Sequence, residues 1–173
     1  MIRVELEKDY EKVEVIVKKA FEEAEFSDKT EHILVNKLRG SESFIKELSI
    51  VAELEGEIVG HCLFTEGKIK NEDKEFRTLV LAPLSVLPEY QRKGIGSELV
   101  NEGIKKAKNL GYESIVVLGH HHYYPKFGFE RSSKYGVKAP FEVPEEALMV
   151  LQLKENSLDE VSGIIIYAKE FFE

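Results

Sequence analysis

The chain has 173 residues, of which 43% are hydrophobic, so it can bury a substantial core and differs from a disordered protein. Its formal net charge of −8 argues against nucleic acid as a general partner, because an acidic surface repels phosphate. It has no apolar run near the roughly 18 residues of a membrane helix, no secretory signal pattern, and a single cysteine, Cys62, which excludes an internal disulfide. We therefore expect one cytoplasmic domain over residues 1–173, with no membrane partner.

The first half of the chain predicts a strand, two helices and three antiparallel strands. Asp9 is a candidate N-cap for the first helix, and Gly40 ends the second. Hairpin turns are expected at Glu55-Gly56 and at residues 71–74. Pro83 cannot donate to a ladder, so it marks a bulge or an edge in the last strand. The expected elements are a strand over residues 2–6, helices over 10–24 and 33–38, and strands over 48–54, 58–69 and 76–86.

The second half predicts a helix after Gly94, a short buried strand over residues 114–118, and strands over 147–153 and 163–167. Because a helix joins the strand before it to the strand after it, those two strands should be parallel. Gly111 is suited to end this helix. Its expected apolar face contains Ile95, Leu99, Val100, Ile104, Ala107 and Leu110. The fold class is therefore mixed α/β (α+β), with a mainly antiparallel sheet, flanking helices and one parallel strand pair.

A short basic loop with two glycines lies between the strand that ends at Val86 and the next helix. N–H groups at a helix start are free, and the helix dipole favours negative charge there. Gly94 and Gly96 lack side chains, so a phosphate can approach the main chain closely. The preceding run Gln91-Arg92-Lys93 adds donors and positive charge. The sequence therefore predicts a phosphate site at this loop.

Two common nucleotide loops do not match this run. A P-loop requires Gly-x-x-x-x-Gly-Lys-Ser/Thr, and a dinucleotide loop requires Gly-x-Gly-x-x-Gly, whose third position here is Leu99. The run instead resembles the signature Gln/Arg-x-x-Gly-x-Gly/Ala of the GNAT superfamily of acetyl-CoA-dependent N-acetyltransferases. The resemblance implies that acetyl-CoA is the cosubstrate and that the loop holds its pyrophosphate. The cofactor-binding residues it implies are Leu84, Ser85, Val86, Gln91, Arg92, Lys93, Gly94, Ile95, Gly96 and Ser97.

The order of elements is also similar to the GNAT fold over nearly the whole chain. In that family the strand before the loop carries a bulge and splays from its parallel neighbour. Main-chain groups there pair with the pantetheine amides, and one N–H polarises the thioester oxygen. Exposed strand groups suit this role, because an extended amide chain completes their hydrogen bonds. The resemblance assigns that place to residues 84–86, and Pro83 directly before them fits a local interruption.

A second motif, Tyr123-Tyr124-Pro125-Lys126-Phe127-Gly128-Phe129, resembles the aromatic-Tyr-x-x-x-Gly-Phe run of many GNAT enzymes. In the family this tyrosine, here Tyr124, lies near the coenzyme A sulfur and often protonates the leaving thiolate. A phenol with a pKa of about 10 is protonated at neutral pH and can donate to a thiolate of similar basicity. Tyr123 and Phe127 are interpreted as packing residues, and Gly128 as a turn. The segments 139–149 and 161–163 also look like a branch of small predicted acetyltransferases.

The base that deprotonates the acceptor amine is left open by the sequence. Glu66, His61, His120 and water are the candidates, and Glu66 and His61 should face opposite sides of their strand. The run His120–His122 departs from the Asp-Pro-like pair common in related sequences. No metal is expected, since adjacent histidines rarely converge on one ion and no carboxylate or cysteine has the spacing to complete a site. Cys62 is interpreted as a buried strand thiol, so the acetyl group should pass directly to the amine.

The sequence thus predicts an enzyme that transfers the acetyl group of acetyl-CoA to a primary amine of a small molecule or peptide. The acidic net charge is compatible with a cationic amine, although solubility alone explains it. A non-catalytic acyl-CoA-binding module is the first alternative, and it would not need Tyr124. A phosphate-binding interaction domain is the second, and it would not prefer coenzyme A over simple nucleotides. The acceptor and the oligomeric state are left open, with a homodimer among the options.

Overall fold

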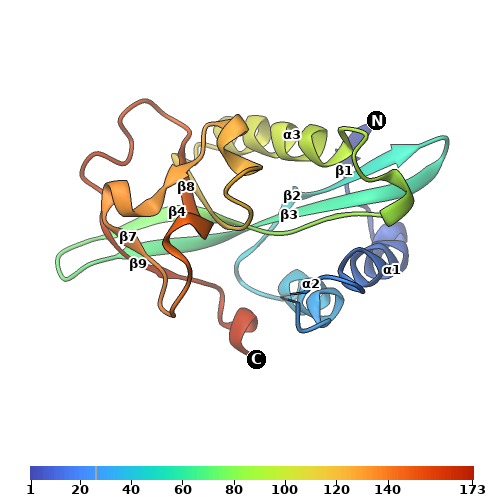
Figure 1. The fold of residues 1–173 in the computed structure, drawn as a ribbon, viewed down its shortest axis with the longest axis horizontal. Helices are drawn as coiled ribbons and strands as arrows, with labels where there is room; N and C mark the ends of the chain where they lie inside the picture. Colours follow the sequence, from blue (N-terminus) through green and yellow to red (C-terminus); the bar gives the residue numbers. More distant parts are fainter. Residues whose placement is uncertain (26) are drawn as a thin grey trace.

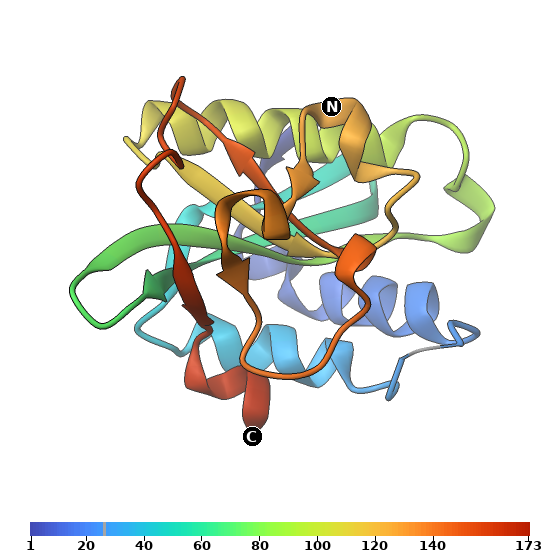
Figure 2. The same ribbon diagram turned by 60° about the vertical axis from the view of Figure 1, so that its left-hand side comes forward.

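The structure is a computed structural model that describes residues 1–25 and 27–173. Helices α1 (Tyr10–Phe21) and α2 (Glu31–Arg39) lie on one face of a sheet, and α3 (Ile95–Asn109) lies on the other (Figures 1 and 2). The strands are β1 (Ile2–Val4), β2 (Phe44–Leu54), β3 (Glu57–Lys70), β4 (Glu75–Val86), β5 (Ser114–Leu118), β6 (Glu130–Arg131), β7 (Val137–Lys138), β8 (Leu148–Gln152) and β9 (Gly163–Ile166).

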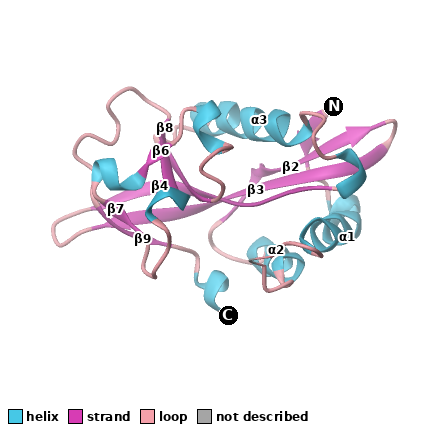
Figure 3. Cartoon of the chain, in the orientation of Figure 1, coloured by secondary structure: helices cyan, strands magenta, loops and turns pink. Residues whose placement is uncertain are grey.

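These nine strands form one twisted sheet in the described part of the chain (Figure 3). The main path runs β1-β2-β3-β4-β5-β8-β6, and β9 joins the far half of β3 to β7. Strands β4 and β5 are parallel and are connected by α3, whereas their neighbours on the path pair antiparallel. The mixed, mainly antiparallel class predicted from the sequence is confirmed, and the short pair β7–β9 adds a second parallel contact.

Several local predictions are confirmed. Glu55 and Gly56 form a two-residue hairpin with positive φ angles of 52° and 83°, as a type I′ turn requires. Gly111 follows α3 with a φ of 90°, and Gly128 ends the turn after Tyr124 with a φ of 102°. The bulge expected at Pro83 is present, because two residues of β4 lie opposite a single residue of β3 there.

Other local predictions were wrong. Asp9 makes no cap to α1, because its carboxylate instead accepts the N–H of Leu6 at 2.8 Å and an Arg3 guanidinium N–H at 2.7 Å. Leu110 was placed on the buried face of α3 but is 41% exposed, since the helix already ends at Asn109. Leu118 was placed in a buried strand but is 45% exposed, because β4 has separated from β5 at that level.

The core between α3 and the sheet depends on a close approach at Gly103. An ideal Cβ at this glycine would lie 2.1 Å from Cε1 of Phe64, so no larger residue fits without displacing the ring. Phe64 is fully buried in β3, together with Leu99 of α3 and Ile115 of β5. The sequence prediction of α3 missed this contact, because the glycine lies between apolar positions in a helical pattern.

Strand β4 has two halves with different neighbours. Residues Leu79–Leu81 pair with β3 on one side and with Ile115–Val117 of β5 on the other. Beyond the bulge, residues Leu84–Val86 pair with β3 alone. The strands β4 and β5 therefore splay apart, and one edge of β4 is left without a neighbouring strand in the described residues.

Candidate active site

The loop between β4 and α3 leaves several main-chain donors free. Arg92 and Gly94 have positive φ angles of 63° and 85°. Helix α3 begins without a side-chain cap, and its first main-chain bond joins the N–H of Glu98 to the carbonyl of Gly94 at 3.0 Å. None of the hydrogen bonds found in the described chain uses the N–H groups of residues 95–97. With the helix dipole added, these groups are suited to bind an anion such as a phosphate.

The splayed half of β4 turns other main-chain groups toward the same region. The N–H of Leu87 donates to a β3 carbonyl at 2.9 Å, and the register then places Ser85 opposite His61. Bonded and non-bonded pairs alternate in antiparallel strands, so Ser85 turns its main-chain groups toward β3. Leu84 and Val86 consequently turn theirs toward the open edge. An extended amide chain could pair with them there as an added strand.

These two features lie in one cleft of about 1010 Å³. The cleft runs from the start of α3, past the splay, to the ends of α1 and α2. The residues that line it are Phe21, Glu31 and Leu34 from α1 and α2; Leu81, Ala82, Pro83, Leu84 and Val86 from β4; Tyr90, Gln91, Arg92, Gly94, Gly96 and Ser97 from the loop and α3; and Leu118, Gly119, His120, Tyr123, Tyr124 and Lys126 after β5.

Tyr124 and most of the cofactor-binding residues expected from the sequence line this cleft, and three of the expected cofactor-binding residues do not. Ser85 is buried with its side chain on the opposite face of β4 from the cleft. Lys93 lies over the ring of Tyr90, with its Nζ 5.5 Å from the ring centroid. Ile95 packs its side chain against the core below α3. In the same region the Gln91 side-chain amide donates to the Val86 carbonyl at 3.0 Å, which confirms that this carbonyl faces away from β3.

Tyr124 is buried and forms part of the cleft wall. Its ring packs edge-on against Phe129, with centroids 5.6 Å apart, and closely against the main chain of Gly119. Burial raises the pKa of the Tyr124 hydroxyl above its ordinary value, so the hydroxyl stays protonated at neutral pH. No hydrogen bond from this hydroxyl is found within the described residues, so it is available to a ligand in the cleft.

Tyr123 packs against Tyr124 and Phe127, with ring centroids 5.1 and 5.4 Å away. It also lines the cleft, which the sequence interpretation did not anticipate. Its hydroxyl lies 3.2 Å from the Oγ of Ser97 in the first turn of α3. The Nζ of Lys126 lies 4.1 Å from its ring centroid and brings a positive charge to the cleft. The sequence analysis did not assign Lys126 to the site, although its position within the motif of residues 123–129 could have indicated it.

The candidate bases separate clearly in the structure. His61 and Glu66 lie on opposite faces of β3, as predicted, and neither lines the cleft. Glu66 accepts a hydrogen bond from Tyr112 at 2.6 Å beside the closed half of β4. His61 is fully buried on the α1 and α2 side, and burial lowers its pKa to about 4. Only His120, among these three, has its side chain on the cleft.

Cys62 is fully buried, and burial raises the pKa of its thiol, which suits a packing role and not that of a nucleophile. The rings of His121 and His122 lie 3.8 Å apart, outside the cleft lining. Within residues 1–25 and 27–173, no group of three or more His, Cys, Asp or Glu side chains is arranged to hold a metal ion. Over the same residues, no helix is long and apolar enough to cross a membrane.

Comparison with known proteins identifies the family to which the chain belongs. The sequence model of the acetyltransferase (GNAT) family matches residues 9–129, which include the loop, the splayed strand and both tyrosines. The chain belongs to the GNAT family of acetyltransferases. The resemblance stated from the loop and tyrosine motifs is therefore confirmed.

Relatives within this GNAT family extend the match to the whole chain. The N-acetyltransferase YhbS of Escherichia coli K12 is 29% identical over 171 residues, or 99% of this chain and 98% of YhbS. The N-acetyltransferase YjhQ of the same strain is 43% identical over 114 residues, which cover 65% of this chain and 63% of YjhQ. Both relatives are described as uncharacterised, so they name a class of reaction without an acceptor.

Two solved structures of similar GNAT proteins contain CoA or acetyl-CoA. YhbS from E. coli in complex with CoA matches 100% of this chain and 92% of its own, with a TM-score of 0.88 and 26% identity. A GNAT acetyltransferase from Brucella melitensis in complex with acetyl-CoA matches 99% of this chain and 97% of its own, with a TM-score of 0.81 and 29% identity.

Proposed function

We propose that residues 1–173 act as a single N-acetyltransferase domain, which transfers the acetyl group of acetyl-CoA directly to a primary amine of a small molecule or peptide. The observation that carries the proposal is the meeting of three features in one cleft. These are the free N–H groups at the start of α3, the open edge of β4, and the Tyr124 hydroxyl. The CoA and acetyl-CoA complexes of the two similar GNAT proteins support the choice of ligand.

In this proposal, the first turn of α3 and Arg92 bind the pyrophosphate, which places the negative charge at the positive end of the helix. Leu84 and Val86 pair with the pantetheine amides as an added strand would. A main-chain N–H near Val86 then points at the thioester oxygen, where negative charge develops during attack. The reacting carbonyl lies at the splay, between the α3 end of the cleft and the α2 end.

The chemical step forms a C–N bond between the amine and the thioester carbon and breaks the C–S bond. The attacking amine must first lose a proton, because an alkylammonium with a pKa near 10.4 is almost wholly protonated at neutral pH. His120 is the side chain we assign to this step, directly or through water, since it lines the cleft beside Tyr124. Tyr124 protonates the departing thiolate, and its hydroxyl is regenerated by exchange with water.

A thermal-shift comparison of acetyl-CoA with ADP tests the ligand assignment. A ligand that binds only the folded protein stabilises it by about 2.7 kcal/mol at 100 times its Kd. Acetyl-CoA should raise the melting temperature much more than ADP at equal concentration, because ADP has no pantetheine arm to pair with β4. Equal shifts would favour a simple phosphate-binding domain.

An acetyl-CoA consumption assay across polyamines, aminoglycosides, amino acids and peptides tests the reaction itself. A primary amine that releases free CoA at a rate well above hydrolysis identifies the acceptor. Strong acetyl-CoA binding with no turnover on any amine would favour the non-catalytic acyl-CoA-binding module. The two assays together separate an error in the ligand from an error in the chemistry.

A further inference from the structure

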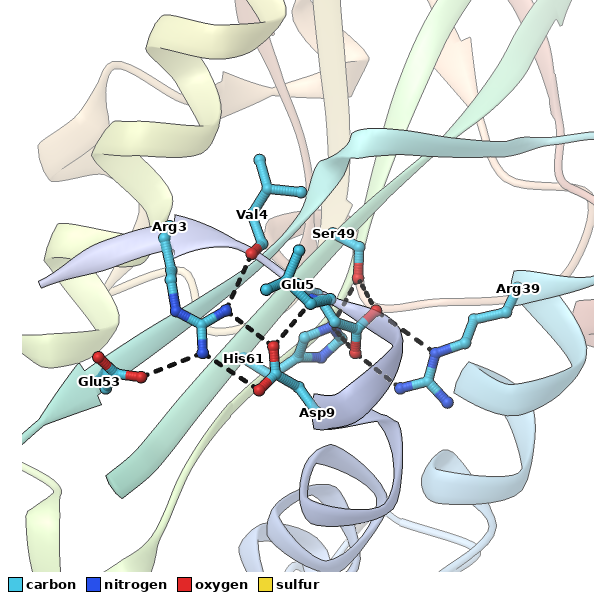
Figure 4. A network of polar contacts seen from close by, with 9 residues as sticks. Arg3, Val4, Glu5, Asp9, Arg39, Ser49, Glu53 and His61 are labelled. Atoms are coloured by element: carbon cyan, nitrogen blue, oxygen red, sulfur yellow. Dashed lines mark hydrogen bonds and ion pairs between the residues drawn. The ribbon is translucent and has the colours of Figure 1, made fainter. Parts of the chain in front are cut away.

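A network of buried polar side chains lies on the α1 and α2 side of the sheet, next to the open half of β4 (Figure 4). Arg39 of α2 donates to the carboxylate of Glu5 at 2.7 Å, and the hydroxyl of Ser49 donates to the same carboxylate at 2.7 Å. The Nε2 of His61 lies 3.0 Å from the Oγ of Ser49. The side chains of Glu5, Ser49 and His61 are almost completely buried.

These contacts fix which nitrogen of His61 carries the proton. The carboxylate of Glu5 is ion-paired with Arg39, so it only accepts hydrogen bonds. The Ser49 hydroxyl spends its single proton on that carboxylate, so its oxygen must accept from His61. His61 is therefore protonated on Nε2, and its Nδ1 presents a bare lone pair. No hydrogen-bond partner of Nδ1 is found in the described residues.

Ser85 supplies the complementary group. It lies directly opposite His61 in the β3–β4 register, and both side chains point to the same face of the sheet. Its Oγ is also buried, and it too has no hydrogen-bond partner in the part of the chain the structure describes. One group is an acceptor without a donor, and the other is a donor without an acceptor. A hydrogen bond between them would satisfy two buried polar atoms at once.

In this structure the two atoms, Ser85 Oγ and His61 Nδ1, are not hydrogen-bonded to each other. We propose that, on rotation of the Ser85 side chain or through one enclosed water, the Ser85 hydroxyl donates a hydrogen bond to His61 Nδ1, and that this contact positions residues 84–86 for the acyl donor. The role in binding rests on the proposed function. Neither Ser85 nor His61 lines the cleft, so both are positioning residues that act through Leu84 and Val86.

The position of Ser85 explains why the contact would matter there. It lies between Leu84 and Val86, which turn their main-chain groups to the open edge, where no strand of residues 1–25 or 27–173 restrains them. Residues 84–86 must therefore be held in place by β3 and by the buried polar groups that pack against it. Through His61, Ser49 and Glu5 this restraint reaches Arg39 of α2, whose other end contributes Glu31 and Leu34 to the cleft. The chain of contacts thus connects the strand for the acyl donor with the helix at the far end of the cleft.

Histidine NMR on the full chain tests the contact without any ligand. With 15N-labelled histidine, His61 should appear as the Nε2–H tautomer. Its Nδ1 resonance should move in Ser85→Ala, which removes the proposed donor and should fold normally. An Nδ1 resonance that is the same in wild type and Ser85→Ala overturns the hydrogen bond, as does a proton found on Nδ1.

Calorimetric titration with acetyl-CoA tests the positioning role. An asparagine side chain can place an acceptor near the Nδ1 position, whereas a glutamine reaches the Nε2 position. Ser85→Ala and His61→Gln should therefore weaken acetyl-CoA binding by about fivefold to tenfold, the scale of one lost hydrogen bond, and His61→Asn should weaken it less. Thr65→Val is the matched control, because the Thr65 Oγ1 is also buried with no partner among the described residues but lies beside the closed half of β4.

The outcomes separate this inference from the proposed function. Affinity losses in Ser85→Ala equal to those in Thr65→Val overturn the positioning role, as does unchanged affinity in a folded Ser85→Ala protein. If wild type itself does not bind acetyl-CoA, the proposed function fails, while the NMR result still decides whether Ser85 and His61 are bonded.

Discussion

The two halves of β4, Leu79–Leu81 and Leu84–Val86, have different surroundings. Residues Leu79–Leu81 are buried between two strands, and their main-chain groups are shared with β3 and β5. Residues Leu84–Val86 have a strand on one side and a cleft on the other. The first half holds the sheet together. In the second half, the main-chain groups of Leu84 and Val86 that face the cleft have no strand partner among the described residues, which is the property a strand needs to bind an extended ligand.

A proline in each half of β4 should give the largest contrast. Val80→Pro removes an N–H that a neighbouring strand uses, so we expect destabilisation of at least about 2 kcal/mol or failure to fold. Val86→Pro removes an N–H that faces the cleft, so the protein should fold while its acetyl transfer falls on the order of 10²- to 10³-fold. Urea unfolding and steady-state rates measure the two effects. Equal destabilisation by both prolines would mean that the second half is as fully paired as the first.

The protein should lose stability in acid, because His61, which lies opposite Ser85 in the open half of β4, is buried in its neutral form. The ordinary pKa of histidine is 6.5, and burial lowers that of His61 to about 4. Between these values the unfolded chain binds a proton that the folded chain does not, so the free energy of unfolding should fall as the pH drops from about 6.5 to about 4. The loss should approach about 3 kcal/mol, and above pH 6.5 this group should contribute no pH dependence.

Urea unfolding at several pH values measures this loss, with His61→Asn as the control. The variant should show a much smaller change over the same interval. Asp9 also loses stabilisation in acid, because its hydrogen-bonded ion pair with Arg3 lowers its pKa below 3.8, but that loss comes at lower pH. A variant with the same pH dependence as wild type would show that other groups govern the transition.

Tyr124→Phe tests whether the open half faces the reacting atoms. The substitution removes only the hydroxyl, so ring packing and acetyl-CoA binding should survive. The kcat on the true acceptor should fall on the order of 10²-fold if proton transfer limits the rate. Tyr123→Phe loses a hydroxyl that contacts Ser97 and should keep a rate close to wild type. Equal losses in the two variants, or full activity in Tyr124→Phe, would assign thiolate protonation to another group or to solvent.

A pair of glycine substitutions, one at each end of α3, tests the position of the phosphate site. Gly94 and Gly111 both have positive φ angles, and neither would bring a Cβ within 4 Å of a neighbour. Asparagine tolerates this backbone region, so Gly94→Asn and Gly111→Asn should lose similar, small amounts of stability. Only Gly94→Asn places a side chain in the cleft, and it should weaken acetyl-CoA binding by about tenfold, or 1.4 kcal/mol. Calorimetry that finds unchanged affinity in Gly94→Asn would place the phosphate elsewhere.

The features that the sequence predicts well are local ones. Pro83 indicates the bulge, Gly111 ends α3, and the alternation along β3 separates His61 from Glu66. The loop from Gln91 to Ser97 is recognisable because its glycines and basic residues are contiguous. In each case the physical cause lies within a few residues of its effect.

The network behind β4 could not be predicted in this way. Glu5 lies 34 residues from Arg39 and 44 from Ser49, and charged residues in an acidic chain are usually exposed. The exposure of Leu118 and the contribution of α2 to the cleft have the same origin. They depend on where β4 leaves β5 and on which helix reaches the gap, and neither is encoded in a local pattern.

The contact between Gly103 and Phe64 has a consequence for the size of the ligand. The Phe64 ring packs into the space left by the missing side chain of Gly103. This contact fixes the position of α3 along β3, because a shift of α3 by one helical turn would place a larger residue against the ring. The start of α3 and the splay of β4 are thereby held at a set separation. In the proposed complex, one end grips the pyrophosphate and the other receives the thioester. The contact between Phe64 and Gly103 thus sets the distance between the phosphate site and the reacting carbonyl. An acyl carrier with a shorter or longer arm would present its carbonyl out of reach of Tyr124.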